Sequence, residues 1–300
     1  MIVNDVHCHF FSANFLRTIG RDLETGGVDA ATALPAALGW EPPGEPEALA
    51  DRWIAELDRQ KVSRAMLIAS VPGDEGSVSA AVRRHPSRFV GAFMFNPAPP
   101  EFEARLEKAM ADEALGTICL FPAMHHVPLD SPSIAAVFAR ADRARRAVFV
   151  HCGVLSVGVR QKLGLASAFD LRLGDPLAVA LLAMKHPGVP VIIPHFGAGR
   201  FTEALMAAGA APNILLDTSS SNAWVRLHPN LTLKEAFARA LDVLGPNRLL
   251  FGTDSSFFPR GWQRPVYEAQ LAVLESLGVD EAARDAVFGG NFNRIFRNTP

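Results

Sequence analysis

The sequence predicts an α/β fold, a single (β/α)8 TIM barrel that takes up all 300 residues. Three observations predict it. Eight short aliphatic runs recur along the chain, they are mostly apolar throughout rather than alternating, and segments with helical periodicity separate them. Continuous apolar runs are typical of parallel strands covered on both faces. Eight strand–helix units favour a closed barrel over an open doubly wound sheet, which does not need eight.

The expected strands give the order of the barrel along the chain. They are residues 2–6, 63–69, 89–95, 116–121, 147–151, 189–194, 213–217 and 248–253. Three signals mark the helices between them. Leu49, Trp53 and Leu57 repeat every four residues, Ser131-Pro132 and Asp175-Pro176 each read as an N-cap followed by proline, and Thr232 with Glu235 forms a capping box.

Two segments extend a minimal barrel. Residues 11–46 form a long insertion after the first strand, rich in Gly, Pro and Ala, which we expect to act as a lid over the site or as an interface with a neighbour. Residues 280–297 form a C-terminal helical extension that Phe292 and Phe296 should pack down. No linker or repeat interrupts residues 1–300, so we expect one domain.

Composition narrows the class of protein. The formal net charge of −2 gives no support to a nucleic-acid or anionic-membrane partner. No apolar run reaches the roughly 20 residues of a membrane span, and no secretory signal is visible. Three cysteines are too few for a disulfide framework, which favours a cytoplasmic location. A homo-oligomer is possible, and the sequence does not decide it.

Five candidate site residues stand at the ends of expected strands: His7, His9, His151, His195 and Asp254. In a barrel these ends meet at one mouth. His7 and His9 are two apart, so both leave one face of the strand while Cys8 leaves the other. Neutral imidazoles of His7, His9 and His151 with the Asp254 carboxylate suit zinc or another divalent ion. The alternative for each histidine is a hydrogen-bonded core residue.

The ordered motifs around these residues resemble the amidohydrolase superfamily. The motifs are Asp5-Val-His7-Cys-His9, Val150-His151-Cys-Gly153, Pro194-His195-Phe-Gly-Ala-Gly199 and Phe251-Gly-Thr-Asp254. Within it the chain is most similar to the amidohydrolase-related branch that includes aminocarboxymuconate semialdehyde decarboxylase and several lactonases. The resemblance implies that His7, His9, His151 and Asp254 bind one divalent metal ion. It also implies that Asp254 handles the proton of a water and that His195 acts as acid, base or carbonyl polariser.

The expected fourth strand departs from much of the superfamily. Many members carry a lysine there, whereas this chain has Cys119. A bridging carbamate is then unavailable, which favours a single ion, most simply Zn2+, with Mn2+ or another divalent ion as alternatives. Cys119 would be a thiolate ligand or a buried apolar side chain, and the second reading is favoured.

These residues predict a hydrolase that cleaves an ester, lactone or amide bond of a small organic acid through a metal-activated water. The main alternative is a non-oxidative decarboxylase of an unsaturated or aromatic-derived acid, since the same ligands serve both reactions. A catalytically inactive binding barrel and metal-independent hydrolysis are further alternatives. Arg160, Arg200 and Arg260 are candidate substrate-binding residues because arginine pairs well with a carboxylate, and a solvated surface position is the alternative for each. Trp262 is a further candidate that could wall an apolar or ring-shaped substrate, with ordinary loop packing as its alternative.

Overall fold

The computed structural model describes residues 1–220 and 223–297, and within them eight parallel strands form one sheet, each strand paired with the next along the chain. The strands are β1 (Asn4–Phe10), β2 (Arg64–Ala69), β3 (Phe89–Phe95), β4 (Leu115–Leu120), β5 (Ala147–Val150), β6 (Val191–Ile193), β7 (Ile214–Asp217) and β8 (Leu249–Leu250). Backbone hydrogen bonds join residues 251–255 to β1 and close the ring, for example Val6 N–H to the Phe251 carbonyl at 3.0 Å. The predicted barrel is confirmed.

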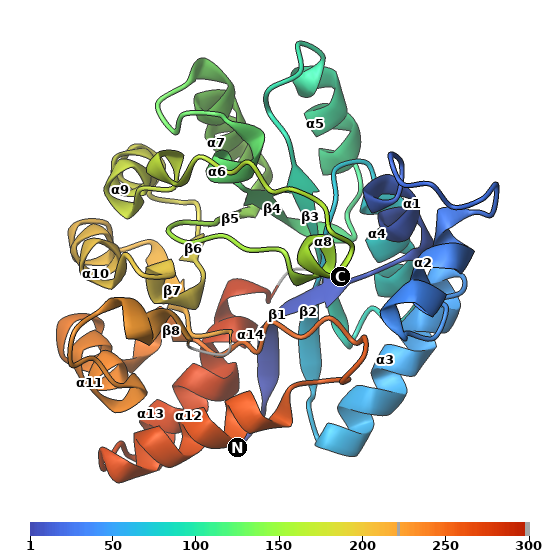
Figure 1. Ribbon diagram of the computed structural model, residues 1–300. Coiled ribbons are helices and arrows are strands. Elements are labelled where there is room, and N and C mark those ends of the chain that lie inside the picture. Colours follow the sequence, from blue (N-terminus) through green and yellow to red (C-terminus); the bar gives the residue numbers. More distant parts are fainter. Residues whose placement is uncertain (221–222, 298–300) are drawn as a thin grey trace.

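Helices surround the strands in a ring (Figure 1). They are α3 (Pro46–Gln60), α4 (Glu75–Arg84), α5 (Phe102–Met110), α7 (Pro132–Ala144), α9 (Pro176–Lys185), α10 (Phe201–Ala210), α11 (Leu233–Leu244) and α12 (Arg264–Ser276). The predicted N-caps are confirmed: Ser131 Oγ accepts a hydrogen bond from Ile134 N–H, and Thr232 with Glu235 forms the capping box of α11. None of the described helices is long and apolar enough to cross a bilayer.

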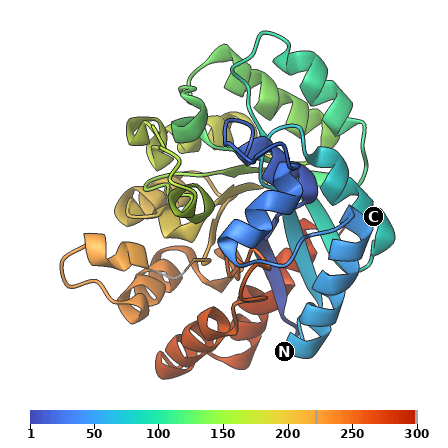
Figure 2. The same cartoon turned by 45° about the vertical axis from the view of Figure 1, so that its right-hand side comes forward.

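The insertion after β1 contains two helices, α1 (Ala13–Ile19) and α2 (Ala30–Leu38). Figure 2 brings them forward beside α3. Serine and aspartate side chains begin both helices, since Ser12 accepts from Phe15 N–H and Asp29 from Ala31 N–H. Two shorter helices, α6 (Pro122–His125) and α8 (Gly158–Lys162), follow β4 and β5, and therefore stand on the same side of the sheet as the carboxyl ends of the strands.

Buried apolar side chains form two clusters, one between the barrel and its helices and one inside the barrel. The C-terminal extension, with α13 (Glu281–Asp285) and α14 (Asn291–Ile295), contributes Phe292 and Phe296 to the inner cluster. Cys119 belongs to the same cluster and is fully buried. Burial raises the pKa of its thiol, which fits the apolar reading of this residue.

Two strand boundaries differ from expectation. The first strand was expected to end at residue 6, yet β1 continues to Phe10 because β2 on one side and residues 251–255 on the other satisfy its backbone. The eighth was expected to run to residue 253, but β8 ends at Leu250. Beyond it the chain meets β1 only irregularly, through a bridge between Ser255 and Cys8, and Asp254 has φ of 61°.

Candidate metal centre

His7 and His9 point from β1 into the mouth of the barrel, where their Nε2 atoms face each other at 3.3 Å. Cys8 between them is fully buried in the cluster outside the barrel, so the expected alternation of side chains is confirmed. Asp254 reaches the same point from the segment after β8. Its Oδ1 lies 3.1 Å from His9 Nε2 and 3.5 Å from His7 Nε2.

The remaining ring nitrogen of each histidine has a fixed partner. His7 Nδ1 is 2.7 Å from Asp217 Oδ2, and His9 Nδ1 is 2.8 Å from Ser70 Oγ. Histidines that bind metal nearly always donate their other N–H to a carboxylate or another acceptor, which fixes the ring. Both histidines are therefore held with Nε2 directed at Asp254.

The spacing of the three ligand atoms is the one that a small divalent ion requires. Zinc binds imidazole nitrogen and carboxylate oxygen at about 2.0–2.2 Å, which in a tetrahedral site separates the ligand atoms by roughly 3.4 Å. The three observed separations are 3.1, 3.3 and 3.5 Å. His7, His9 and Asp254 therefore fit one divalent ion.

His195 and His151 complete the surroundings. Within residues 1–220 and 223–297, possible ligand atoms of His7, His195 and Asp254 all lie within 4.8 Å of one another. The ring of His151 lies 5.4 Å from that of His195, centroid to centroid, and stacks on Phe121. The structure thus brings all five predicted residues together, and it is His195 rather than His151 that joins His7 and Asp254 in this group.

Close packing of two loops places His151 and His195 side by side. Gly153, just after His151, has φ of +69°, and a Cβ there would lie 2.2 Å from the Gly197 carbonyl oxygen. Val154 N–H donates to the Ala198 carbonyl at 2.8 Å. Only glycine permits this approach, so Gly153 allows the loops that follow His151 and His195 to pack together.

Burial and mutual charge set the protonation of the cluster. Burial lowers the pKa of His151 and of His195 below the usual range. Burial alone would raise the pKa of Asp254, but the hydrogen bond from His9 and the charges of the nearby histidines hold it well below its ordinary value. For His7 burial is the largest influence and opposes protonation, but the charge and hydrogen bond of Asp217 together with the charges of Asp254 and Asp5 outweigh it and raise the pKa. A strongly acidic Asp254 remains a carboxylate, the form that binds a cation.

A cavity of about 640 Å³ opens above the cluster. Phe11, Phe15 and Trp40 from the insertion line it together with Phe258 from the loop after β8. Their rings stack in a row, with centroid distances of 4.1 Å from Phe15 to Phe11, 5.9 Å from Phe11 to Trp40 and 5.6 Å from Trp40 to Phe258. The insertion therefore forms one wall of the cavity.

The four candidate substrate-binding residues lie in different places. Arg160 on α8 and Arg260 after β8 line the cavity. Arg200 is the N-cap of α10 and is not among the residues described as lining it. Trp262 is buried behind the site, where its indole N–H donates to Asp5 Oδ2 at 2.7 Å, and it does not line the cavity either.

Three residues that hold the site were missed from the sequence: Ser70, Asp217 and Ser219. Asp217 is the last residue of β7, so the strand-end criterion that selected Asp254 would have found it. Ser70 and Ser219 each follow a strand by one or two residues, but serines are common in loops and carry no comparable signal.

Solved structures resemble the whole chain. An amidohydrolase from Burkholderia multivorans with bound zinc has 15% identity and a TM-score of 0.67, covering 100% of both chains. A probable 2-pyrone-4,6-dicarboxylic acid hydrolase from Acinetobacter baumannii has 14% identity and a TM-score of 0.61, covering 99% of this chain and 100% of that one. 5-Carboxyvanillate decarboxylase from Novosphingobium aromaticivorans, complexed with manganese, has 15% identity and a TM-score of 0.65, covering 99% and 96%. No curated protein matches significantly.

A family model that matches nearly the whole sequence assigns the family. The amidohydrolase family model Amidohydro_2 matches residues 4–297, which include both ends of the barrel and all five residues of the cluster. The chain therefore belongs to this amidohydrolase family, as its strand-end histidines and aspartate indicated.

Proposed function

We propose that the protein is a metal-dependent hydrolase that cleaves an ester, lactone or amide bond of a small organic acid. The observation that carries the proposal is the triangle of His7 Nε2, His9 Nε2 and Asp254 Oδ1, whose sides match one small divalent ion at the base of a cavity. A single ion, Zn2+ or Mn2+, fits a site in which an apolar Cys119 stands in place of a lysine.

A bound divalent ion supplies Lewis acidity, which activates water and polarises a substrate carbonyl. The protein contributes the rest. Asp254 is the only carboxylate among the described residues that line the cavity, and its side chain is 34% exposed, so it can take up a proton from water at the reacting carbonyl. His151 and His195 line the cavity beside it.

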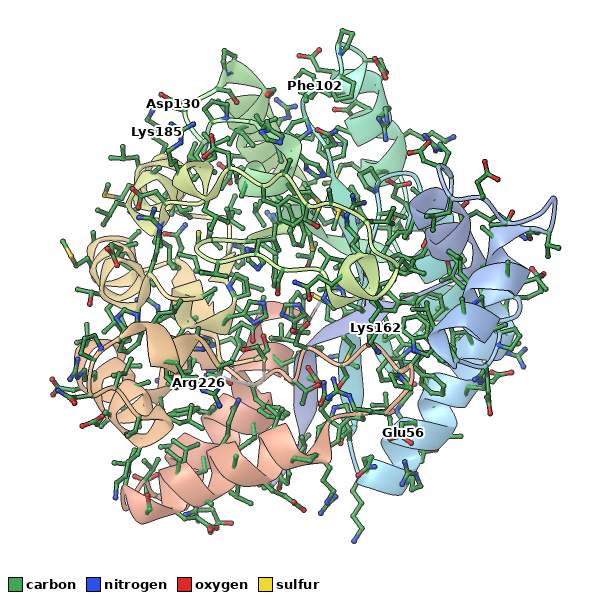
Figure 3. All side chains as sticks on the ribbon, viewed as in Figure 1. Glu56, Phe102, Asp130, Lys162, Lys185 and Arg226 are labelled. Carbon is green, nitrogen blue, oxygen red and sulfur yellow. The ribbon has the colours of Figure 1, made fainter. Side chains whose placement is uncertain are left out.

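Three cations around the mouth favour an acidic substrate. Arg160, Lys162 and Arg260 all line the cavity, and none has an acidic ion-pair partner in the described part of the chain. Figure 3 labels Lys162 on α8, near the centre of the ring of helices. Cations without an acidic partner attract carboxylates and hold them through charge-assisted hydrogen bonds. We assign this rim, formed by Arg160, Lys162 and Arg260, to the carboxylate of the substrate.

The row of stacked rings favours a flat substrate. Phe11, Trp40 and Phe258 present aromatic faces and edges along one wall, and aromatic pairs gain about 0.5–1.5 kcal/mol beyond simple burial. An acid with an aromatic or unsaturated ring would use both this wall and the cationic rim. The insertion that supplies the wall would then serve as a lid.

A non-oxidative decarboxylase is the second candidate. Met94, Phe121 and Val71 line the cavity that contains the ligand cluster. Apolar surroundings withdraw water from a carboxylate, which favours its loss as carbon dioxide. Hydrolysis and decarboxylation share the ligands and differ in their products.

Purification without added metal, followed by elemental analysis and a substrate panel, tests the proposal. We expect one equivalent of divalent metal per chain, and proton release from lactones or esters of ring-derived acids that a chelator abolishes and metal restores. Release of carbon dioxide instead would identify the decarboxylase. Turnover that survives complete metal removal would contradict both metal-dependent candidates, and a metal-loaded protein inert toward the whole panel would indicate a binding barrel.

A further inference from the structure

The hydroxyl of Ser219, two residues after the end of β7, joins three other side chains. Its Oγ lies 2.8 Å from Asp217 Oδ2, 3.0 Å from His7 Nδ1 and 2.9 Å from His195 Nδ1. Ser219 and Asp217 are fully buried, and the two histidines are at most 8% exposed. The backbone N–H of Ser219 also donates to Asp217 Oδ1 at 2.7 Å, which fixes the serine on the carboxylate.

The direction in which the Ser219 hydroxyl donates its hydrogen determines the other hydrogen bonds of this cluster. A carboxylate only accepts hydrogen bonds, so Asp217 Oδ2 needs a hydrogen from each close neighbour. His7 Nδ1–H supplies one. If the Ser219 proton pointed elsewhere, two oxygen atoms would face each other at 2.8 Å with no hydrogen between them, which is costly away from water. Ser219 therefore donates to Asp217.

The hydrogen bond from Ser219 to Asp217 determines which ring nitrogen of His195 carries the hydrogen. With its only proton directed at Asp217, Ser219 Oγ offers nothing but lone pairs to His195, so the 2.9 Å contact requires a hydrogen on His195 Nδ1. A neutral imidazole has one N–H. We infer that Ser219 is a positioning residue that holds neutral His195 as the Nδ1–H tautomer, with Nε2 presenting a lone pair.

This tautomer selects among the roles that the sequence left open for His195. A lone pair on Nε2 binds a cation or accepts a proton, but it cannot donate a hydrogen bond to a developing oxyanion. His195 lines the cavity, and its ring offers a possible ligand atom within 4.8 Å of those of His7 and Asp254. In the proposed hydrolase, on which this consequence rests, a neutral His195 thus acts as ligand or proton acceptor.

His9 offers a matched control, because the hydroxyl of a different serine, Ser70, accepts a hydrogen bond from its Nδ1. Ser70 Oγ donates to the Ile68 carbonyl at 2.9 Å and therefore accepts from His9 Nδ1–H at 2.8 Å. In the described part of the chain, the Ser70 hydroxyl bonds to His9 and Ile68 and the Ser219 hydroxyl to Asp217, His7 and His195, so the two serines act on different histidines. Each hydroxyl therefore controls the tautomer of its own histidine.

Nitrogen NMR of the imidazole rings measures the tautomer directly and needs no substrate. Full-length protein labelled with 15N would be recorded without metal and with one equivalent of zinc, at a pH where His195 is neutral, and a His195→Gln variant would identify its signals. We expect hydrogen on Nδ1 of His195 in the wild type. In metal-free Ser219→Ala we expect most of the ring to shift to the Nε2–H form that imidazole prefers in water, while Ser70→Ala changes only the signals of His9.

Wild-type spectra with the hydrogen of His195 on Nε2 would overturn the inference, whatever the variants do. An unchanged His195 tautomer in folded, metal-free Ser219→Ala would overturn it as well. Because these spectra do not depend on turnover, the tautomer assignment and the proposed hydrolase can fail separately.

Discussion

His7 and Asp217 form a buried pair, with Nδ1 2.7 Å from Oδ2 and both side chains at most 2% exposed. Asp217 accepts the Nδ1 hydrogen and thereby leaves Nε2 for the metal. We predict that Asp217→Asn lowers the affinity for zinc about 10–100-fold, the usual effect of removing an outer partner of a metal-binding histidine. Competition with a chromophoric chelator measures it. The exposed Asp242→Asn serves as the control and should bind zinc as the wild type does.

Asp254 is predicted to act in catalysis rather than in stability. Its carboxylate lies 3.1 Å from His9 Nε2, and its side chain borders the cavity instead of the core. Asp254→Asn should reduce kcat by about 10²–10⁴-fold, the usual contribution of a positioned acid or base, while the melting temperature changes little. Steady-state kinetics on a substrate from the panel, with thermal unfolding alongside, gives both quantities. Near-wild-type kcat in this variant would remove Asp254 from the mechanism.

Gly252 is predicted to be required because its backbone lies too close to Asp217 and His7 to leave room for a side chain. A Cβ at this position would lie 2.6 Å from Asp217 Oδ1 and 3.1 Å from His7 Cβ. Gly252→Ala should therefore displace both side chains, destabilise the fold by about 1–3 kcal/mol and weaken metal binding. Denaturant unfolding and metal titration report the two effects. Gly209 on α10 has open space around it, so Gly209→Ala should be neutral or stabilising by about 0.5–1 kcal/mol.

Trp262 is predicted to stabilise the fold without binding substrate. It is 2% exposed, and its indole N–H donates to Asp5 Oδ2 at 2.7 Å. Trp262→Phe keeps an aromatic ring but leaves the Asp5 carboxyl short of a donor, which should cost about 1–3 kcal/mol in the free energy of unfolding. KM should stay within twofold of the wild type, by order of magnitude. A large rise in KM at unchanged stability would contradict this prediction and indicate that Trp262 binds substrate.

Asp5 is predicted to give the fold a pH dependence. Burial raises the pKa of its carboxyl from 3.8 to about 6, although Thr253, the His7 backbone and Trp262 all donate to it. A pKa raised in the folded state contributes stability below pH 3.8 that is lost as the pH rises through 6. Between pH 5 and 7 the wild type should lose about 1 kcal/mol more than Asp5→Asn. Denaturant unfolding at both pH values measures the difference, and parallel behaviour of the two proteins would contradict it.

The architecture could be predicted from the sequence because strand and helix signals are local. Leu49, Trp53 and Leu57 repeat at helical spacing, and all three are fully buried on α3. The ends of β1 and β8 could not be predicted, because they depend on pairing between segments about 245 residues apart. Asp254 N–H donates to the His7 carbonyl there, a contact that no local pattern contains.

The candidate metal ligands were also accessible from the sequence, since strand ends in a barrel meet by necessity. Their partners were not, apart from Asp217. Ser219 gains its role from the positions of Asp217, His7 and His195, and a serine in a loop gives no hint of them. Trp262 looked like a substrate contact because it follows Asp254 closely, but the chain turns it inward toward Asp5.

The row of rings from Phe15 to Phe258 has an evolutionary consequence. It ties the segment between β1 and α3 to the loop that follows Asp254, while the ligand atoms themselves sit on the barrel below. Exchange of that segment would therefore remodel what enters the cavity and leave the ion-holding atoms untouched. A single set of histidines can in this way be reassigned to new substrates by changes in about thirty-five residues near the N-terminus.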